Sequence, residues 1–227
     1  MHLSIDFWRT VAFSNPEYSA RRLDFLESEL NVFRDTINDS LKEVGKFTDN
    51  YNVAGHLSIS DMYGMLLELI SQKVKDKKLT FKHDPALLRK TIDGLFLKYP
   101  PVLNSKLFGM IDWNKYNTIN LSSNTGYISG ELIKSFLDNV LTDFKIDFYA
   151  FSDELECSKP QPKFFNHVRS QCSDVKVTHL GDDLFADIYG ANSCGMDALY
   201  YNNNSLIEYT LNGQYSNFHR LHDNGKK

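Results

Sequence analysis

The chain has 227 residues, of which 42% are hydrophobic and 24% are charged, and its formal net charge at pH 7 is -4. These values suit one large globular domain, or a core that carries an insertion. The acidic balance, without a long basic run, argues against nucleic acid as a partner. No apolar run approaches the roughly 18 residues of a membrane-spanning helix. The residues after Met1 also lack the pattern of a signal peptide, so we expect no membrane partner.

The cysteines indicate a reducing compartment. Cys157, Cys172 and Cys194 are odd in number and irregular in spacing, which favours reduced thiols in a cytoplasmic protein over a disulfide framework or a zinc site. The seven histidines are scattered and lack the spacing of metal ligands. The basic stretch from Lys73 to Lys82 is interpreted as a solvated helix end or loop.

The segment from Asn15 to about Lys90 has the pattern of several amphipathic helices. Asn15 is expected to be an N-cap, followed by Pro16 at the first helical position and by the acidic Glu17 in the first turn. Further helix starts are predicted at Ser58 and at Asp84-Pro85. The apolar positions that recur at steps of three or four after the first cap are Leu23, Leu26, Leu30, Phe33, Ile37, Leu41 and Val44. The segment therefore predicts a helical module.

From about Asn117 the pattern alternates between strands and helices, which predicts a parallel sheet with crossover helices. The expected strands are Thr118–Ser122, Phe144–Phe151, Val175–Leu180 and Ala198–Tyr201. The expected helices are Ile128–Val140, Pro160–Cys172 and Leu184–Asn192. Residues Met1–Ile5 form a strand of the same type, so the predicted fold class is α/β, with the helical module inserted after the first strand. The asparagine run at Asn202–Asn204 predicts a turn, and the last few residues are expected to fray.

Four short polar signals follow the predicted strands in order. They are Asp6, then Ser123, then Lys159, and then an acidic cluster that begins at Asp182. Each has an ordinary reading alone: a turn cap, a helix entry or an acidic first turn. Together they lie at the carboxyl ends of strands, where open α/β sheets bind ligands. A carboxylate nucleophile, two phosphate-holding groups and a cation site form a set that can hold a phosphoryl group.

These signals resemble the motifs of the haloacid dehalogenase-like (HAD) superfamily. The family pattern is an apolar strand followed by Asp-x-Asp-x-Thr, a Ser or Thr after the second core strand, a Lys before a helix, and Gly-Asp-x-x-x-x-Asp. The matching residues are Asp6 to Thr10, Ser123, Lys159, Gly181-Asp182 and Asp187. The resemblance implies a Rossmann-like HAD core over residues 1–14 and 112–227, and a helical C1 cap over 15–111.

The resemblance also implies roles for the site residues. Asp6 would attack phosphorus and form an aspartyl-phosphate, while Ser123 and Lys159 would hold the phosphoryl oxygens of a small-molecule substrate, such as a phosphoester. Asn124 and Thr10 complete the implied substrate-binding set. Magnesium is the implied cofactor. Its implied ligand set is Asp6, the backbone carbonyl of Trp8, Asp182, Asp183 and Asp187.

Trp8 departs from the family pattern, because it stands where phosphatases of the family carry a second aspartate that moves protons. An indole N–H is a donor only and cannot serve as a general acid at neutral pH. Loss of such a group costs about 10²- to 10⁴-fold in rate. Phosphoryl chemistry with impaired proton transfer is the first interpretation. A metal-free dehalogenase-like hydrolase and a non-catalytic ligand-binding or interaction protein remain alternatives.

Overall fold

The computed structural model describes residues 1–74, 85–142, 144–173, 176–202, 204–209 and 215–218. The expected helix cap at Asp84, most of the basic stretch after Lys73, the expected strand start at Val175 and the last nine residues lie outside this part of the chain. Within the described ranges, no helix is both long and apolar enough to cross a membrane.

A mostly parallel sheet forms the centre of the fold, with strand order β5-β4-β1-β6-β7-β8-β9. Strands β5 to β7 in this order run parallel, and β8 and β9 pair antiparallel at one edge. The strands are β1 (His2–Asp6), β4 (Thr118–Ser123), β5 (Phe148–Phe151), β6 (Val177–Gly181), β7 (Asp197–Asn202), β8 (Ser205–Tyr209) and β9 (Tyr215–Phe218). The α/β fold class predicted from the sequence is therefore confirmed.

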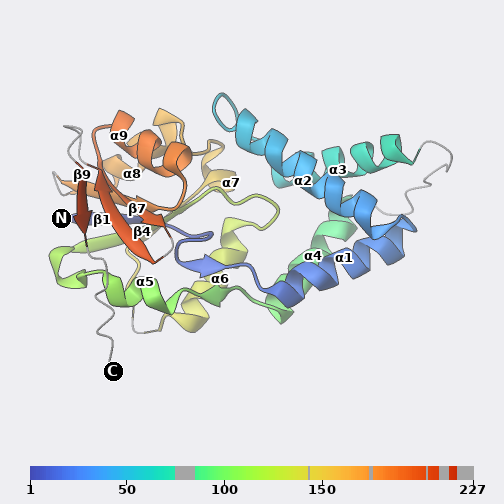
Figure 1. Cartoon of the computed structure of the whole chain (residues 1–227), viewed down its shortest axis with the longest axis horizontal. Helices are drawn as coiled ribbons and strands as arrows, with labels where there is room; N and C mark the ends of the chain where they lie inside the picture. Colours follow the sequence, from blue (N-terminus) through green and yellow to red (C-terminus); the bar gives the residue numbers. More distant parts are fainter. Residues whose placement is uncertain (75–84, 143, 174–175, 203, 210–214, 219–227) are drawn as a thin grey trace, which may run out of the picture.

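Helices cover both faces of this sheet (Figure 1). One face packs on α5 (Ser105–Met110) and α6 (Gly130–Val140), and the other on α8 (Pro162–Ser170), the π-helical turn η2 (Leu184–Tyr189) and α9 (Gly190–Ser193). Two short helices, η1 (Trp113–Lys115) and α7 (Ser152–Leu155), complete the described core. Because side chains alternate along a strand, Leu3 and Ile5 face one layer, and His2 and Ser4 face the other.

Four longer helices lie to one side of the sheet (Figure 1). They are α1 (Pro16–Leu30), α2 (Arg34–Tyr51), α3 (Ile59–Lys73) and α4 (Pro85–Lys98). The Asn15 side chain accepts a hydrogen bond from the Glu17 backbone at 2.9 Å, as expected for an N-cap. Ser58 and Asp61 form a reciprocal capping box at the start of α3. Both caps were predicted from the sequence.

Several predicted boundaries were wrong. The period that ran through Leu30 and Phe33 breaks at Asn31, whose φ of 50° ends α1 in a left-handed turn. Phe33 is 82% exposed and precedes α2 instead of joining an apolar face. Strand β5 starts at Phe148, four residues later than predicted. The region after Asn202 contains β8 and β9, which the emphasis on turn residues did not predict.

A two-stranded ribbon connects the four helices to the core. It pairs β2 (Ala12–Phe13) with β3 (Val102–Leu103), and neither strand joins the central sheet. Phe108 of α5 packs edge-on against Phe144 with ring centroids 5.8 Å apart, so α5 belongs with the core by its contacts. We propose that the cap is formed by α1 to α4 and that its boundary lies before β3 rather than at residue 111.

Aromatic rings join the cap to the core. Phe96 of α4 lies edge-to-face with Trp8 at 6.4 Å, with Phe136 of α6 at 6.5 Å and with Tyr18 of α1 at 6.1 Å between ring centroids. Phe96 is 1% exposed. Edge-to-face pairs of this kind add about 0.5–1.5 kcal/mol beyond the burial of their area. The Trp8 indole is therefore a packing element between the two parts of the molecule.

Candidate active site

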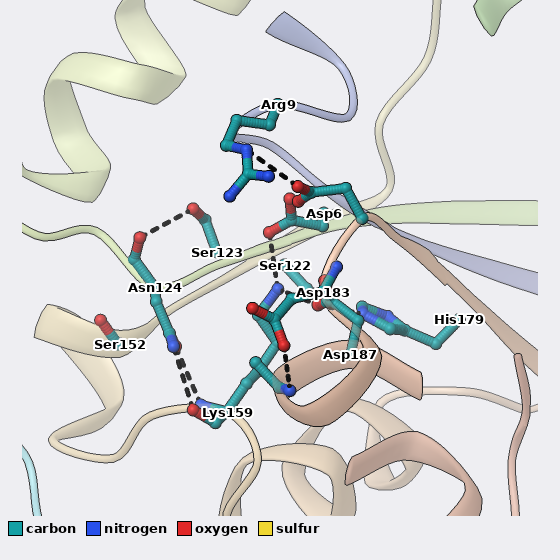
Figure 2. Close-up of polar contacts among 12 residues, drawn as sticks. Asp6, Arg9, Ser122, Ser123, Asn124, Ser152, Lys159, His179, Asp183 and Asp187 are labelled. Carbon is teal, nitrogen blue, oxygen red and sulfur yellow. Dashed lines mark hydrogen bonds and ion pairs between the residues drawn. The ribbon is translucent and has the colours of Figure 1, made fainter. Parts of the chain in front are cut away.

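Lys159 joins two buried carboxylates at the carboxyl end of the sheet (Figure 2). Its Nζ atom lies 2.6 Å from Asp6 Oδ1 and 2.6 Å from Asp187 Oδ1. Asp6 ends β1. Lys159 lies in the segment between β5 and α8, and Asp187 lies in the π-helical turn after β6. All three residues are at most 5% exposed. The structure thus assembles the first, third and last members of the predicted set.

Asp187 has every side-chain oxygen engaged. Its Oδ1 also accepts a hydrogen bond from His179 Nε2 at 3.0 Å, and its Oδ2 accepts the backbone N–H of Asp183 at 3.0 Å. Gly181 makes this close approach possible, since a Cβ atom there would stand 2.2 Å from the Asp187 carboxyl carbon. Asp187 is therefore held rigidly beside Lys159.

A buried series of hydrogen-bonded polar side chains contacts His179. Burial lowers the pKa of His179, which favours the neutral imidazole. Since Nε2 donates to the Asp187 carboxylate, Nδ1 must accept, and its donor is the Ser4 hydroxyl at 3.0 Å. Ser4 in turn lies 2.7 Å from Ser122 Oγ, which accepts from Asn120 Nδ2 at 2.9 Å. These side-chain hydrogen bonds were not predicted from the sequence. Their only sequence signal is the polar residues at inward positions of otherwise apolar strands.

A second ion pair joins Arg9 to Asp182, with Arg9 Nε 3.0 Å from Asp182 Oδ2. The Arg9 side chain is 74% exposed, whereas that of Asp182 is 12% exposed. Carboxylate oxygens from Asp6, Asp182 and Asp187 all lie within 4.8 Å of one another. An all-oxygen donor set of this kind suits Mg²⁺.

The carboxylates titrate differently because their surroundings differ. Burial raises the pKa of Asp6 to about 7, although the Lys159 ammonium opposes the rise. Burial also raises the pKa of Asp182 to about 6, against the opposing Arg9 guanidinium. For Asp187, burial is outweighed by Lys159 and by the His179 hydrogen bond, so its pKa falls well below the usual range. Lys159 and Arg9 together balance two of the three carboxylate charges, and a divalent cation would relieve the remaining excess of negative charge.

Asp183 has a different part in the site. Its Oδ1 accepts the backbone N–H groups of Phe185 and Ala186, each at 2.8 Å, and so caps the π-helical turn. Its side chain does not belong to the cluster of oxygens formed by Asp6, Asp182 and Asp187. The geometry favours a capping role for Asp183 over the metal-ligand role that the sequence suggested.

Of the remaining predicted substrate-binding residues, Asn124 contacts Lys159, and Ser123 and Thr10 are buried. Asn124 exchanges two hydrogen bonds with the Lys159 backbone, donating to its carbonyl at 3.0 Å and accepting from its N–H at 2.8 Å. Ser123 is buried, and its hydroxyl donates to the Asn124 carbonyl at 3.2 Å. Thr10 is fully buried, and its Oγ1 lacks a hydrogen-bond partner among the described residues. Asn124 therefore orients the lysine segment.

A cavity of about 190 Å³ lies between the cap and the loops of the core. The cap side includes Asp49, His56 and Met62, and the core side includes Asn124 and Tyr127. The loop between α2 and α3 also contacts the residues on either side of Lys159. His56 Nδ1 lies 3.1 Å from Ser158 Oγ, and the Gln161 side chain donates to the Asn52 and Gly55 carbonyls. Sequence reasoning did not identify these cap contacts, because no motif marks them.

No family model matches the chain. A 62-residue segment is 36% identical to the pyrimidine 5'-nucleotidase PynA of Streptococcus pneumoniae and covers 26% of each protein. The chain thus matches only about a quarter of the length of this curated relative. YfnB of Bacillus subtilis, assigned to the HAD-hydrolases and bound to magnesium, is structurally similar with a TM-score of 0.65 and 16% identity, over 88% of this chain and 86% of YfnB. The 2-haloacid dehalogenase of Pseudomonas syringae has a TM-score of 0.57 and 17% identity, over 88% and 86%.

Proposed function

We propose that this chain, which has the fold of the haloacid dehalogenase-like (HAD) hydrolases, is a magnesium-dependent hydrolase of small phosphoesters. The observation that carries the proposal is the contact of Lys159 with both Asp6 and Asp187, next to the third carboxylate of Asp182. A free carboxylate oxygen, an ammonium group and a cluster of oxygen ligands are the components that phosphoryl transfer to an aspartate requires.

Asp6 is the proposed nucleophile, since it ends the central strand and its Oδ1 is already oriented by Lys159. In the first step a carboxylate oxygen of Asp6 forms a bond to phosphorus, and the bond from phosphorus to the leaving oxygen breaks. Water then attacks the aspartyl-phosphate and releases phosphate. Lys159 neutralises charge on the phosphoryl oxygens, and the Asn124 contacts keep its backbone in place.

Magnesium fits the oxygen cluster of Asp6 and Asp182, with Asp187 as the third nearby carboxylate. When bound, it would withdraw charge from the phosphoryl group and screen the crowded carboxylates. Support comes from the raised pKa values of Asp6 and Asp182, which indicate more negative charge than Lys159 and Arg9 balance. One structurally similar hydrolase, YfnB, binds magnesium.

Trp8 limits the proposed chemistry. Its ring packs on Phe7 and Phe96, so it fills space between core and cap and offers no titratable group. Leaving groups that depart as weak bases need little protonation, whereas alkoxides need a proton donor. We therefore propose good turnover of aryl and acyl phosphates and poor turnover of alkyl phosphates such as sugar phosphates.

The direct test is hydrolysis of 4-nitrophenyl phosphate with magnesium by wild type and by Asp6→Asn. Asp6→Asn removes the nucleophile and should abolish turnover, while Asp39→Asn on the exposed face of α2 should match wild type. Phosphate release that survives Asp6→Asn, or none in wild type with magnesium bound, refutes the proposal.

A second candidate is a metal-free dehalogenase, favoured by structural similarity to the 2-haloacid dehalogenase and by the non-acidic residue at position 8. Halide release from 2-chloropropionate without metal, together with no hydrolysis of aryl phosphates, would favour it. Failure of both reactions, with magnesium bound, would favour a ligand-binding protein.

A further inference from the structure

Five buried polar atoms without a hydrogen-bond partner gather where the cap helices meet the loop after β4. Within the described part of the chain, they are Tyr18 Oη, Arg22 Nε, Tyr63 Oη, Asp93 Oδ1 and Tyr127 Oη. Tyr18 and Arg22 lie on α1, Tyr63 on α3, Asp93 on α4 and Tyr127 on the core loop. We call these five residues the tyrosine–arginine cluster.

The members of the cluster are close to one another. The Arg22 guanidinium carbon lies 5.5 Å from the centre of the Tyr18 ring and 5.9 Å from that of Tyr127. The rings of Tyr63 and Tyr127 meet at 5.1 Å and 62°. Asp93 is near enough to affect the titration of both Tyr18 and Tyr63. The unpartnered atoms therefore form one site rather than five separate defects.

Such a site is costly without a ligand. A buried hydroxyl or guanidinium N–H that gives up water without gaining a partner loses its full hydration, so native proteins keep few of them. Tyr63 is 1% exposed and Tyr18 is 5% exposed. Three hydroxyls and a guanidinium N–H without partners in one place indicate a position where a ligand completes the hydrogen bonds.

The chemistry of the cluster selects an anion. Burial raises the pKa of Tyr18, Tyr63 and Tyr127, so their hydroxyls stay protonated and can donate. Arg22 is a permanent cation with donors only. Asp93 is the one acid of the cluster; Arg89 Nε lies 3.6 Å from its Oδ2 and so offsets its charge, and burial raises its pKa. Oxygen atoms of an anion would accept from these groups, and the cation–π stacking holds the guanidinium in position.

Tyr127 connects the cluster to the cavity between the cap and the core loops. Tyr127 and Asn124 line the same 190 Å³ cavity, and so does Met62, the neighbour of Tyr63. The cavity reaches Gly126 as well, where the space beyond the backbone is open. A molecule in this cavity can therefore contact both Asn124, which holds the Lys159 backbone, and Tyr127 of the cluster.

We propose that the tyrosine–arginine cluster is a second anion subsite, which binds a carboxylate or a second phosphate at the far end of the substrate. The inference rests on the proposed function for the location of the first phosphoryl group. It narrows the substrate class to small phosphoesters that carry a further anionic oxygen group.

Binding of phosphonates, which cannot be hydrolysed, tests the subsite separately from catalysis. Calorimetry with magnesium would compare benzylphosphonate, 4-carboxybenzylphosphonate and 1,4-xylylene bisphosphonate. Hydrogen bonds to charged groups predict that wild type binds at least one doubly anionic probe roughly 10- to 100-fold more tightly than benzylphosphonate. The carboxylate and bisphosphonate arms tell which second group is preferred. Arg22→Gln should remove this preference, and Arg21→Gln, on the exposed side of the same helix, should keep it.

Tyr63→Phe provides a readout that a purely structural role would not produce. Removing an unpartnered buried hydroxyl should raise the melting temperature without ligand, yet weaken binding of the preferred doubly anionic probe. Tyr51→Phe, at a half-exposed position of α2, should change neither. Equal affinity of wild type for all three probes, or an unchanged preference in Arg22→Gln, would overturn the inference. Tight selective binding without hydrolysis of any aryl phosphate would instead refute the proposed function and leave the subsite standing.

Discussion

The Lys159 ammonium lies 2.6 Å from the Asp6 carboxylate, and both groups are almost completely buried. Either charge alone would destabilise the fold, because the cost of removing a buried ion from water is offset only by its attraction to a partner. The pair therefore orients the nucleophile before a substrate arrives, and the Lys159 ammonium opposes the rise in the Asp6 pKa that burial causes. The same ammonium also contacts Asp187, which couples the first and last motifs of the chain.

Replacing the lysine should damage both stability and activity. Lys159→Met leaves Asp6 and Asp187 without their shared cation, and breaking a buried ion pair costs about 3–5 kcal/mol. Urea unfolding at pH 7 should show a loss of this size, and turnover of aryl phosphates should fall below detection. Lys163→Met, at an exposed position of α8, should leave both measurements near wild type. An equally stable Lys159→Met would contradict the assigned role of the pair.

Magnesium affinity should rise with pH. The pKa of Asp6 is raised to about 7 and that of Asp182 to about 6, so both bind protons in the metal-free protein at mildly acidic pH. Protons compete with a cation for these oxygens, and the cation binds better once the carboxylates ionise. Calorimetry should show an affinity at least about tenfold higher at pH 8 than at pH 5.5. An affinity that stays flat over this range would disagree with the assignment of Asp6 and Asp182 as ligands.

Restoring an acid at position 8 should broaden the leaving groups that the enzyme accepts. Trp8→Asp should raise kcat/KM for alkyl phosphates by about ten- to a thousand-fold, because a carboxyl group can protonate the departing oxygen. The substitution should also lower stability by about 3–5 kcal/mol, as the ring packing on Phe96 is lost. Trp8→Phe retains a ring without an acid, and its ratio of aryl to alkyl turnover should equal that of wild type. Equal hydrolysis of both ester classes by wild type would mean that another residue supplies the proton.

Gly181 should tolerate no side chain. The Cβ atom of Gly181→Ala would stand 2.2 Å from the Asp187 carboxyl carbon, so either β6 or Asp187 must move. A shift of Asp187 removes one of the two anchors of Lys159, and we expect at least about a hundredfold loss of kcat. Gly64→Ala places its methyl group in open space on α3 and should fold and turn over normally. Normal kcat in Gly181→Ala would show that the position of Asp187 is not critical.

The hydrogen bond from Ser4 to His179 should affect both the stability of the protein and the tautomer of His179. Ser4→Ala removes the donor to His179 Nδ1 and leaves a buried ring nitrogen unpartnered, which costs about 1–3 kcal/mol. Nitrogen-15 NMR of the imidazole should then show a mixture of tautomers in place of the Nε2–H form. Ser14→Ala, which removes an exposed hydroxyl, serves as the control. A single unchanged tautomer in Ser4→Ala would argue that Asp187 alone sets the ring.

Local patterns predicted most of the elements and the order of the site residues along the chain. The caps at Asn15 and Ser58 act on backbone groups within three residues, so a short stretch of sequence predicts them. The alternation of strands and helices predicted the α/β class, and the class then placed Asp6, Ser123 and Lys159 at one edge of the sheet. Strands β8 and β9 were missed because antiparallel edge pairing depends on a partner that the local sequence does not display.

Only the tertiary structure could show which groups touch. Lys159 and Asp6 are 153 residues apart, and nothing in the local sequence shows that the same ammonium also reaches Asp187. The hydrogen-bonded series from Ser4 to His179 crosses two strands, and the tyrosine–arginine cluster draws on three cap helices and a core loop. Motif order records where a residue lies along the backbone, whereas hydrogen bonding, burial and pKa depend on neighbours that folding brings from elsewhere in the chain.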